Sequence, residues 1–126
     1  MNARKEIDQL LKQLEQQPDD TRLAIRIADL MVKAGDHKSA NDLYERAAGV
    51  YAKQGFMLKA IALAKQVLER DPTRLRLRQT VAQQYEKLAL TTEALAQYQL
   101  LLSDQEASGD LDGAAMTAAA LKRLAR

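Results

Sequence analysis

Apolar residues recur along most of the chain at the spacing of one helix face. The first stretch, residues 3–17, has them at positions i, i+3, i+4 and i+7: Ile7, Leu10, Leu11 and Leu14. Because an α-helix turns once every 3.6 residues, these side chains share one side of the helix. Pro18 disfavours helical backbone in the residue before it, so we expect this helix to end there.

The same period predicts six further helices. The second is capped by Asp20 or Thr21 and closed at Gly35. The next four begin near residues 38, 57, 74 and 92, and the last occupies residues 113–126. β-branched residues never form a run, which leaves strands without support. The chain is therefore expected to be all-α, with short turns between the helices.

Residues 70–79, RDPTRLRLRQ, are the one stretch that alternates polar and apolar residues as a strand does. Apolar residues then continue at helical spacing, at Leu77, Val81, Tyr85 and Leu88. A helical period over some sixteen residues outweighs five alternating ones. We predict a helix here too.

Composition excludes several classes of protein. With 126 residues, 47% hydrophobic and 29% charged, the chain has the size and balance of one soluble domain. It has no cysteine, hence no disulfide framework, and its net charge of +2 is too small to indicate nucleic acid or membrane binding. No apolar stretch is long enough for a membrane span. We expect a cytoplasmic protein of bacterial type.

The sequence repeats itself at a constant offset in residue number, from Ala40 to Ala94. The same offset relates Tyr44 to Tyr98, Gly55 to Gly109, and Pro18 to Pro72. We call it the long period. We therefore expect a single domain, 1–126, that consists of a leading helix, 1–18, and two three-helix units, 19–72 and 73–126.

A shorter offset lies within the long period, from Ala60 to Ala94, and it resembles that of tetratricopeptide repeats. Small, aliphatic and aromatic residues follow that family's order in two frames: Ala24, Ile27, Ala28, Met31, Ala40, Tyr44 and Ala47, and then Val81, Ala82, Tyr85, Ala94 and Tyr98. A third frame begins at Asn41 and overlaps the first, and Arg78 and Leu101 depart from the pattern. The resemblance implies a right-handed α-solenoid of about seven antiparallel helices and a non-catalytic scaffold that binds other proteins.

The resemblance also implies a site. In that family, fixed positions of the first helix of each repeat line a concave groove. Here these positions include Arg22, Ile25, Arg26, Asp29, Lys33, Arg76, Gln79, Thr80, Gln83 and Lys87. Such a basic, partly apolar groove suits a peptide with acidic side chains or a free carboxylate. Arg22 and Arg26 match a carboxylate clamp of some members, whereas Asp29 and Gln83 replace its asparagines.

Catalytic chemistry has no support in the sequence. The single histidine, His37, lies in a Gly-Asp-His-Lys turn, where we expect a solvated surface residue. No nucleophile elbow, phosphate-binding glycine loop or HExxH motif is present. The acidic residues from Asp104 to Asp112 lack the spacing of a calcium loop. We expect no enzyme activity, metal or cofactor.

Two other functions remain open. Nucleic acid would contact Arg70, Arg74, Arg76 and Arg78. These arginines form no single stripe and we expect them to be solvated, which makes this function the less favoured one.

A homo-oligomer would use the small residues of the last helix: Ala114, Ala115, Ala118, Ala119 and Leu121. We expect that face to pack on the preceding helix instead.

Overall fold

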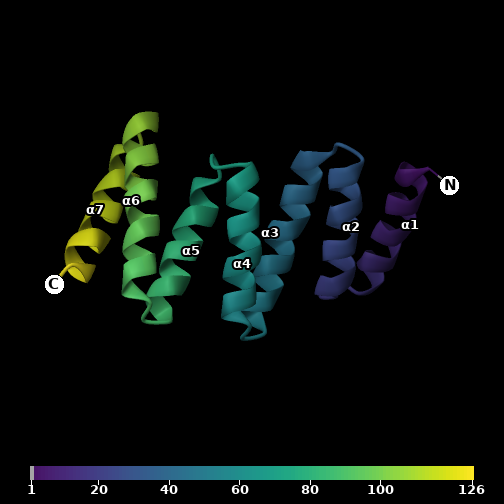
Figure 1. Cartoon of the computed structure of the whole chain (residues 1–126), viewed down its shortest axis with the longest axis horizontal. Helices are drawn as coiled ribbons and strands as arrows, with labels where there is room; N and C mark the ends of the chain where they lie inside the picture. The colour runs from purple at the N-terminus through teal and green to yellow at the C-terminus, as the bar shows by residue number, and fades with distance from the viewer. Residues whose placement is uncertain (1) are drawn as a thin grey trace. The chain divides into compact units, whose positions relative to one another are not determined.

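The computed structural model describes residues 2–126, which form seven α-helices and no strand (Figure 1). The helices are α1 (Ala3–Gln16), α2 (Thr21–Lys33), α3 (His37–Lys53), α4 (Met57–Arg70), α5 (Leu75–Lys87), α6 (Thr91–Ser108) and α7 (Leu111–Leu124). The predicted all-α class is confirmed, and the alternating segment after Arg74 is helical.

The long period extends to the helix ends. The offset from Ala40 to Ala94 is also the offset from the first residue of α2 to that of α5, and from the last residue of α2 to that of α5. The two ends of α7 follow those of α4 by the same offset. The helix boundaries therefore repeat even where the capping residues differ: the Asp20 side chain caps α2, whereas Arg74 makes no such bond at the start of α5.

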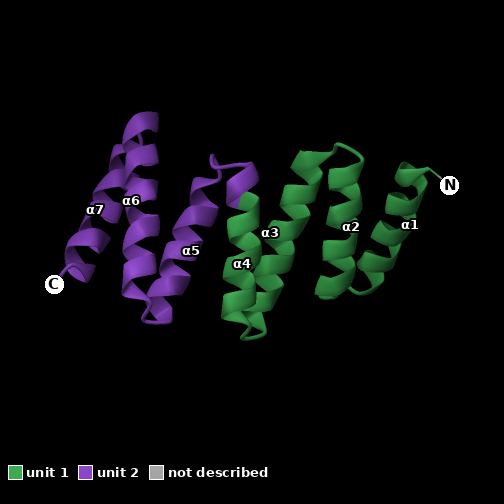
Figure 2. Ribbon diagram, viewed as in Figure 1, with its two compact units in different colours: residues 1–67 green, residues 68–126 purple. Residues whose placement is uncertain are grey.

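The chain divides into two compact units, residues 1–67 (unit 1) and 68–126 (unit 2), shown in two colours in Figure 2. The division lies inside α4, whereas the sequence repeat divides after residue 72. The single domain and its subdivision at residues 18 and 72 stay predictions.

Each unit is built around a helix pair with alanines at the contact. In unit 1, α2 packs against α3, and Ala28 and Ala40 have no exposed surface. In unit 2, α5 packs against α6, and Ala82 and Ala94 are equally buried. Residues without long side chains let two helix backbones approach closely.

A tyrosine joins the two helices of each pair. The hydroxyl of Tyr44 donates a hydrogen bond to Asp29, and that of Tyr98 donates to Oε1 of Glu86 at 2.9 Å. Both rings are almost fully buried. Each pair thus has an aromatic ring in its core and a carboxylate as partner for the hydroxyl, which avoids an unsatisfied polar group.

The turn between α5 and α6 has a strained residue. Gly35, between α2 and α3, has φ +86°, in the left-handed region that glycine adopts readily. Ala89, its equivalent in the long period, adopts φ +59°, where its Cβ crowds the following carbonyl. The turn of unit 2 therefore keeps the left-handed conformation although alanine replaces the glycine that adopts it readily.

We predict opposite effects for two substitutions at this turn position. Ala89→Gly should raise the free energy of unfolding by about 0.5–1 kcal/mol, and Gly35→Ala should lower it by about 1 kcal/mol. Urea unfolding followed by circular dichroism measures both. A loss of stability in Ala89→Gly would show that Ala89 is not strained.

Candidate partner-binding groove

Two hollows of unit 2 lie between α5 and α7. The larger has a volume of about 500 Å³ and is lined by Gln83, Glu86, Lys87, Tyr98 and Arg123. The smaller has about 200 Å³ and is lined by Leu75, Arg76, Gln79, Gln105, Asp110, Gly113 and Met116. We call the two together the α5–α7 groove.

The packing of α5 and α7 on α6 produces this groove. Both helices contact α6 and are joined to it by short turns, so they run in the same direction. Tyr98 and Gln105 of α6 reach the two hollows from between them. These two residues lie about two helical turns, or about 10 Å, apart along α6, which sets the distance between the hollows.

An ion pair spans the larger hollow. Nη1 of Arg123 donates to Oε2 of Glu86 at 2.6 Å, and Nη2 donates to Oε1 at 3.3 Å. The Arg123 hydrogen bond, assisted by that of Tyr98, holds the pKa of the Glu86 carboxyl below its usual value. Burial, together with the hydrogen bond to Glu86, raises the pKa of Tyr98 to about 12. Charge-assisted bonds of this kind tie α7 to α5.

The smaller hollow has a buried amide in its wall. Gln105 is 6% exposed, and its Oε1 accepts a hydrogen bond of 2.7 Å from the buried hydroxyl of Thr117. Asp110 caps α7 by accepting from the Gly113 backbone N–H at 3.0 Å. A Cβ added at Gly113 would collide with Oδ2 of Asp110 and lie 2.9 Å from Nε2 of Gln105. A side chain at Gly113 would therefore force Asp110 or Gln105 to move.

The structure brings most of the predicted α5 residues together at this groove. Arg76 and Gln79 line the smaller hollow, and Gln83 and Lys87 line the larger one. Thr80 lines neither, and its hydroxyl donates to the backbone carbonyl of Arg76 at 3.1 Å.

Sequence reasoning missed the α6 and α7 side of the groove. The groove-lining positions of the resembled family were counted only from the starts of α2 and α5. The same count from Leu111 would have included Met116 and Arg123. No sequence pattern that we used indicates Gln105 or Gly113, because their role depends on contacts with each other.

The predicted residues of α2 lie on the surface of unit 1. Arg22, Arg26, Asp29 and Lys33 are exposed and Ile25 is half-buried. Arg26 pairs with Glu6 of α1 at 3.9 Å, and Asp29 accepts the Tyr44 hydroxyl. None of them lines the two hollows of the α5–α7 groove or the hollow formed by Pro72, Leu75 and Asp104.

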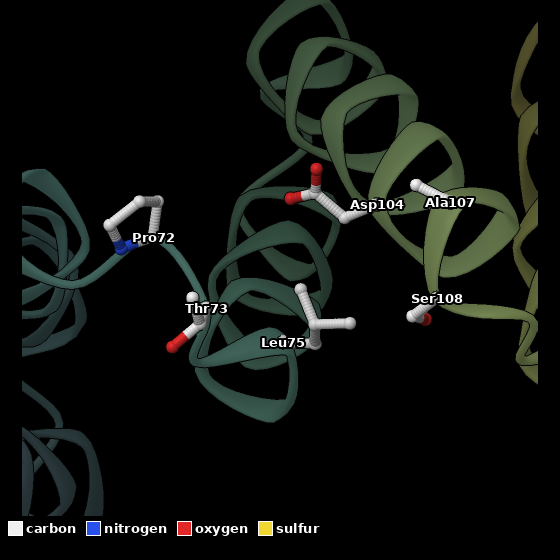
Figure 3. A pocket seen from close by; sticks show the side chains of 6 residues that line it. All are labelled: Pro72, Thr73, Leu75, Asp104, Ala107 and Ser108. Atoms are coloured by element: carbon white, nitrogen blue, oxygen red, sulfur yellow. The ribbon is translucent and has the colours of Figure 1, made fainter.

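A third hollow, of about 410 Å³, lies on another side of unit 2, where α5 begins and α6 ends (Figure 3). Its lining residues are Pro72, Thr73, Leu75, Asp104, Ala107 and Ser108. None of the predicted groove residues lines it. It is a mostly apolar surface with one carboxylate, from Asp104, and it shares only Leu75 with the groove.

The arginine cluster is divided between surface and core. Arg78 is only 9% exposed, and its Nη1 donates to Oε1 of Gln97 at 2.9 Å. The expectation that Arg78 is solvated is wrong, because its position faces the core as Ala24 does in unit 1. Arg74 is bound to Asp71 at 3.0 Å. Only Arg70 and Arg76 of the cluster are exposed, so it presents no continuous basic surface.

The alanines of α7 do not form one packed face. Ala114 is buried and Leu121 half-buried, whereas Ala115, Ala118 and Ala119 are exposed. The expected packing of the whole set on the preceding helix is therefore wrong for these three. The helix period turns them away from α6.

Two further observations concern the described residues as a whole. Residues 2–126 contain no cluster of three or more His, Cys, Asp or Glu side chains arranged to hold a metal ion. None of their helices has both the length and the apolar character that crossing a bilayer requires.

Comparisons with known proteins find likenesses among solved structures alone. No protein-family model matches the chain, and no curated protein sequence matches it. Among solved structures, the crystal structure of MamA superposes with a TM-score of 0.49 at 12% sequence identity. The alignment covers 94% of this chain and 84% of that chain. The chemistry of the chain's own surface is therefore the guide to its function.

We predict that Glu86→Gln destabilises unit 2 in a pH-dependent way. The folded-state pKa of Glu86 is lowered, so its contribution is present above the unfolded-state value of 4.5 and is lost as pH falls through the folded-state value. Urea unfolding between pH 7 and pH 3 should show a gap in the free energy of unfolding between wild type and variant, and this gap should close on acidification. Glu106→Gln, on the exposed surface of α6, is the control and should show no such gap. A gap that is constant with pH would contradict the role of this ion pair.

Two glycine-to-alanine substitutions should change the free energy of unfolding in opposite directions. Gly49 lies in α3 with nothing within 4 Å of an added Cβ, so Gly49→Ala should raise the free energy of unfolding by about 0.5–1 kcal/mol. Gly113→Ala should lower it by about 1 kcal/mol, because the new Cβ displaces the Asp110 cap. Thermal and urea unfolding measure both, and equal gains would show that Asp110 and Gln105 adapt without cost.

Proposed function

We propose that this chain is a non-catalytic protein-interaction module, a scaffold or adaptor of the tetratricopeptide kind. It holds a peptide or helix of a partner protein in the α5–α7 groove. The observation that carries this proposal is that four of the five α5 residues selected by the repeat pattern line two adjoining hollows, with α7 as the opposite wall.

The groove has the mixed character of a peptide site. Lys87 and Arg76 supply positive charge at its two ends, and Leu75 and Met116 supply apolar surface. Met116 is 70% exposed, and long flexible side chains of this kind adapt to varied partners. An extended peptide with acidic residues matches such a surface in both charge and polarity.

The proposal predicts binding that depends on groove charges. A random peptide library displayed on phage is selected against the full chain, and the best peptide is measured by fluorescence anisotropy. Arg76→Glu combined with Lys87→Glu should weaken binding about tenfold or more, because like charges then face the acidic peptide.

A charge-matched control carries Lys5→Glu and Lys12→Glu, both on the exposed surface of α1. It should bind as wild type does. Failure to enrich any peptide, or equal weakening in both double variants, would reject the groove as the site. Circular dichroism verifies that all proteins are folded.

A further inference from the structure

We infer that the hollow between the start of α5 and the end of α6 is a second contact site, which holds an arginine side chain of a partner protein. This hollow, which we call the α5–α6 hollow, has a volume of about 410 Å³ and shares only Leu75 with the α5–α7 groove. Figure 3 shows the carboxylate of Asp104 extending from α6 into the space between that helix and Pro72 and Leu75. The inference goes beyond the proposed function and does not depend on the groove.

The charge of the hollow favours a cation. Asp104 is the one charged residue among those that line it, and its carboxylate has no hydrogen bond or ion pair within residues 2–126. Arg74 follows the lining residue Thr73 in the sequence, but it is bound to Asp71 at 3.0 Å and does not line the hollow. A ligand carboxylate would be repelled by Asp104, and a purely apolar ligand would cover that charge without pairing it, which costs free energy.

The polar groups of the lining have their donors already in use. The hydroxyl of Thr73 donates to Oδ1 of Asp71, and that of Ser108 donates to a backbone carbonyl of α6 at 3.1 Å. The backbone N–H of Thr73 also donates to Asp71, at 3.2 Å, and that of Leu75 donates to the Thr73 carbonyl at 2.9 Å. Pro72 has no N–H. A ligand must therefore bring donors, and a guanidinium has five N–H donors and no acceptor.

The apolar part of the lining suits the stem of an arginine. It consists of Pro72, Leu75 and Ala107. An arginine packs its methylene groups on apolar surface while its charged head reaches a polar partner. Leu100 lies one helical turn before Asp104 on the same face of α6 and is 50% exposed, so an apolar residue next to the arginine also finds a surface to contact.

Unit 1 has a guanidinium of its own at the equivalent place. In the long period Arg46 of α3 corresponds to Leu100 of α6, and Pro18 corresponds to Pro72. Nη2 of Arg46 donates to the backbone carbonyl of Pro18 at 3.1 Å. In unit 2 the arginine is replaced by an exposed leucine, and the Pro72 carbonyl accepts no hydrogen bond within the described part of the chain. This corner of unit 2 therefore keeps the acceptors of such a contact without the cation, which is the reason to choose arginine over lysine.

Parallel selections from the phage library test this inference. One selection uses the full wild-type chain, and the other uses Asp104→Asn, which keeps the shape of the side chain and removes its charge. Peptides enriched on wild type alone should share an arginine next to an apolar residue. In the best of these peptides, citrulline in place of the arginine should weaken binding about fivefold or more in fluorescence anisotropy, because the charge-assisted hydrogen bonds to Asp104 are lost.

The same two peptides measured on protein variants locate the contact. Asp104→Asn should weaken the arginine peptide about as much as citrulline does, and it should bind the two peptides equally. Glu106→Gln removes a charge from the exposed surface of α6 outside the hollow and should keep the wild-type difference between the peptides.

A further pair of variants uses the comparison with unit 1. Leu100→Arg gives unit 2 the residue that unit 1 has at this position, and its guanidinium should occupy the hollow and weaken the arginine peptide about fivefold or more. Leu100→Gln has a long side chain without charge and should weaken that peptide less. Circular dichroism verifies that all four variants are folded.

The possible outcomes decide between this site and the groove. Enrichment of the same peptides on wild type and Asp104→Asn, or of none on either, would overturn the arginine site, and so would a wild-type set that contains no arginine. Lysine that serves as well as arginine in the best peptide would overturn the choice of a guanidinium. Loss of binding in the Arg76→Glu, Lys87→Glu variant concerns the groove alone, so either site can fail while the other stands.

Discussion

The close approach of paired helices at alanine residues is the constraint on which the rest of the structure depends. Ala28 and Ala40 in unit 1, and Ala82 and Ala94 in unit 2, have no exposed surface. Because these side chains are short, the neighbouring tyrosine rings lie in the core and their hydroxyls reach a carboxylate on the partner helix. Larger residues at these positions would separate the helices and leave the hydroxyls unsatisfied.

The two units satisfy the tyrosine hydroxyl from different turns of the first helix. Tyr44 uses Asp29, fifteen residues before it, whereas Tyr98 uses Glu86, twelve residues before it. The later position brings Glu86 within reach of Arg123 on α7. The carboxylate of unit 2 thus lies one helical turn later than that of unit 1. In unit 1 the hydrogen bond stays within one helix pair, whereas in unit 2 it belongs to a network that joins three helices and crosses the groove.

Unit 2 also has the more polar interior. Arg78, Gln105 and Thr117 are buried there, compared with Asn41 in unit 1. Arg78 has five N–H donors and a single hydrogen bond, to Gln97, within unit 2. Buried polar groups cost free energy unless they are paired, and they restrict how the surrounding helices can pack. Gln105 shows how such a group can also face a surface hollow and give it chemical character.

The sequence by itself determined the helices, most of their ends and the exposed face of α5, because helical period and end signals act over a few neighbouring residues. Arg76, Gln79, Gln83 and Lys87 could be selected without a structure because the groove positions of the resembled repeat family were counted from the predicted start of this helix. Tertiary structure alone decided that Arg78 is buried and that Arg123 reaches Glu86. It also decided that Gln105 and Gly113 share one hollow. The reason is that each of these features depends on which residues of other helices lie opposite, and the packing of α5, α6 and α7 sets that.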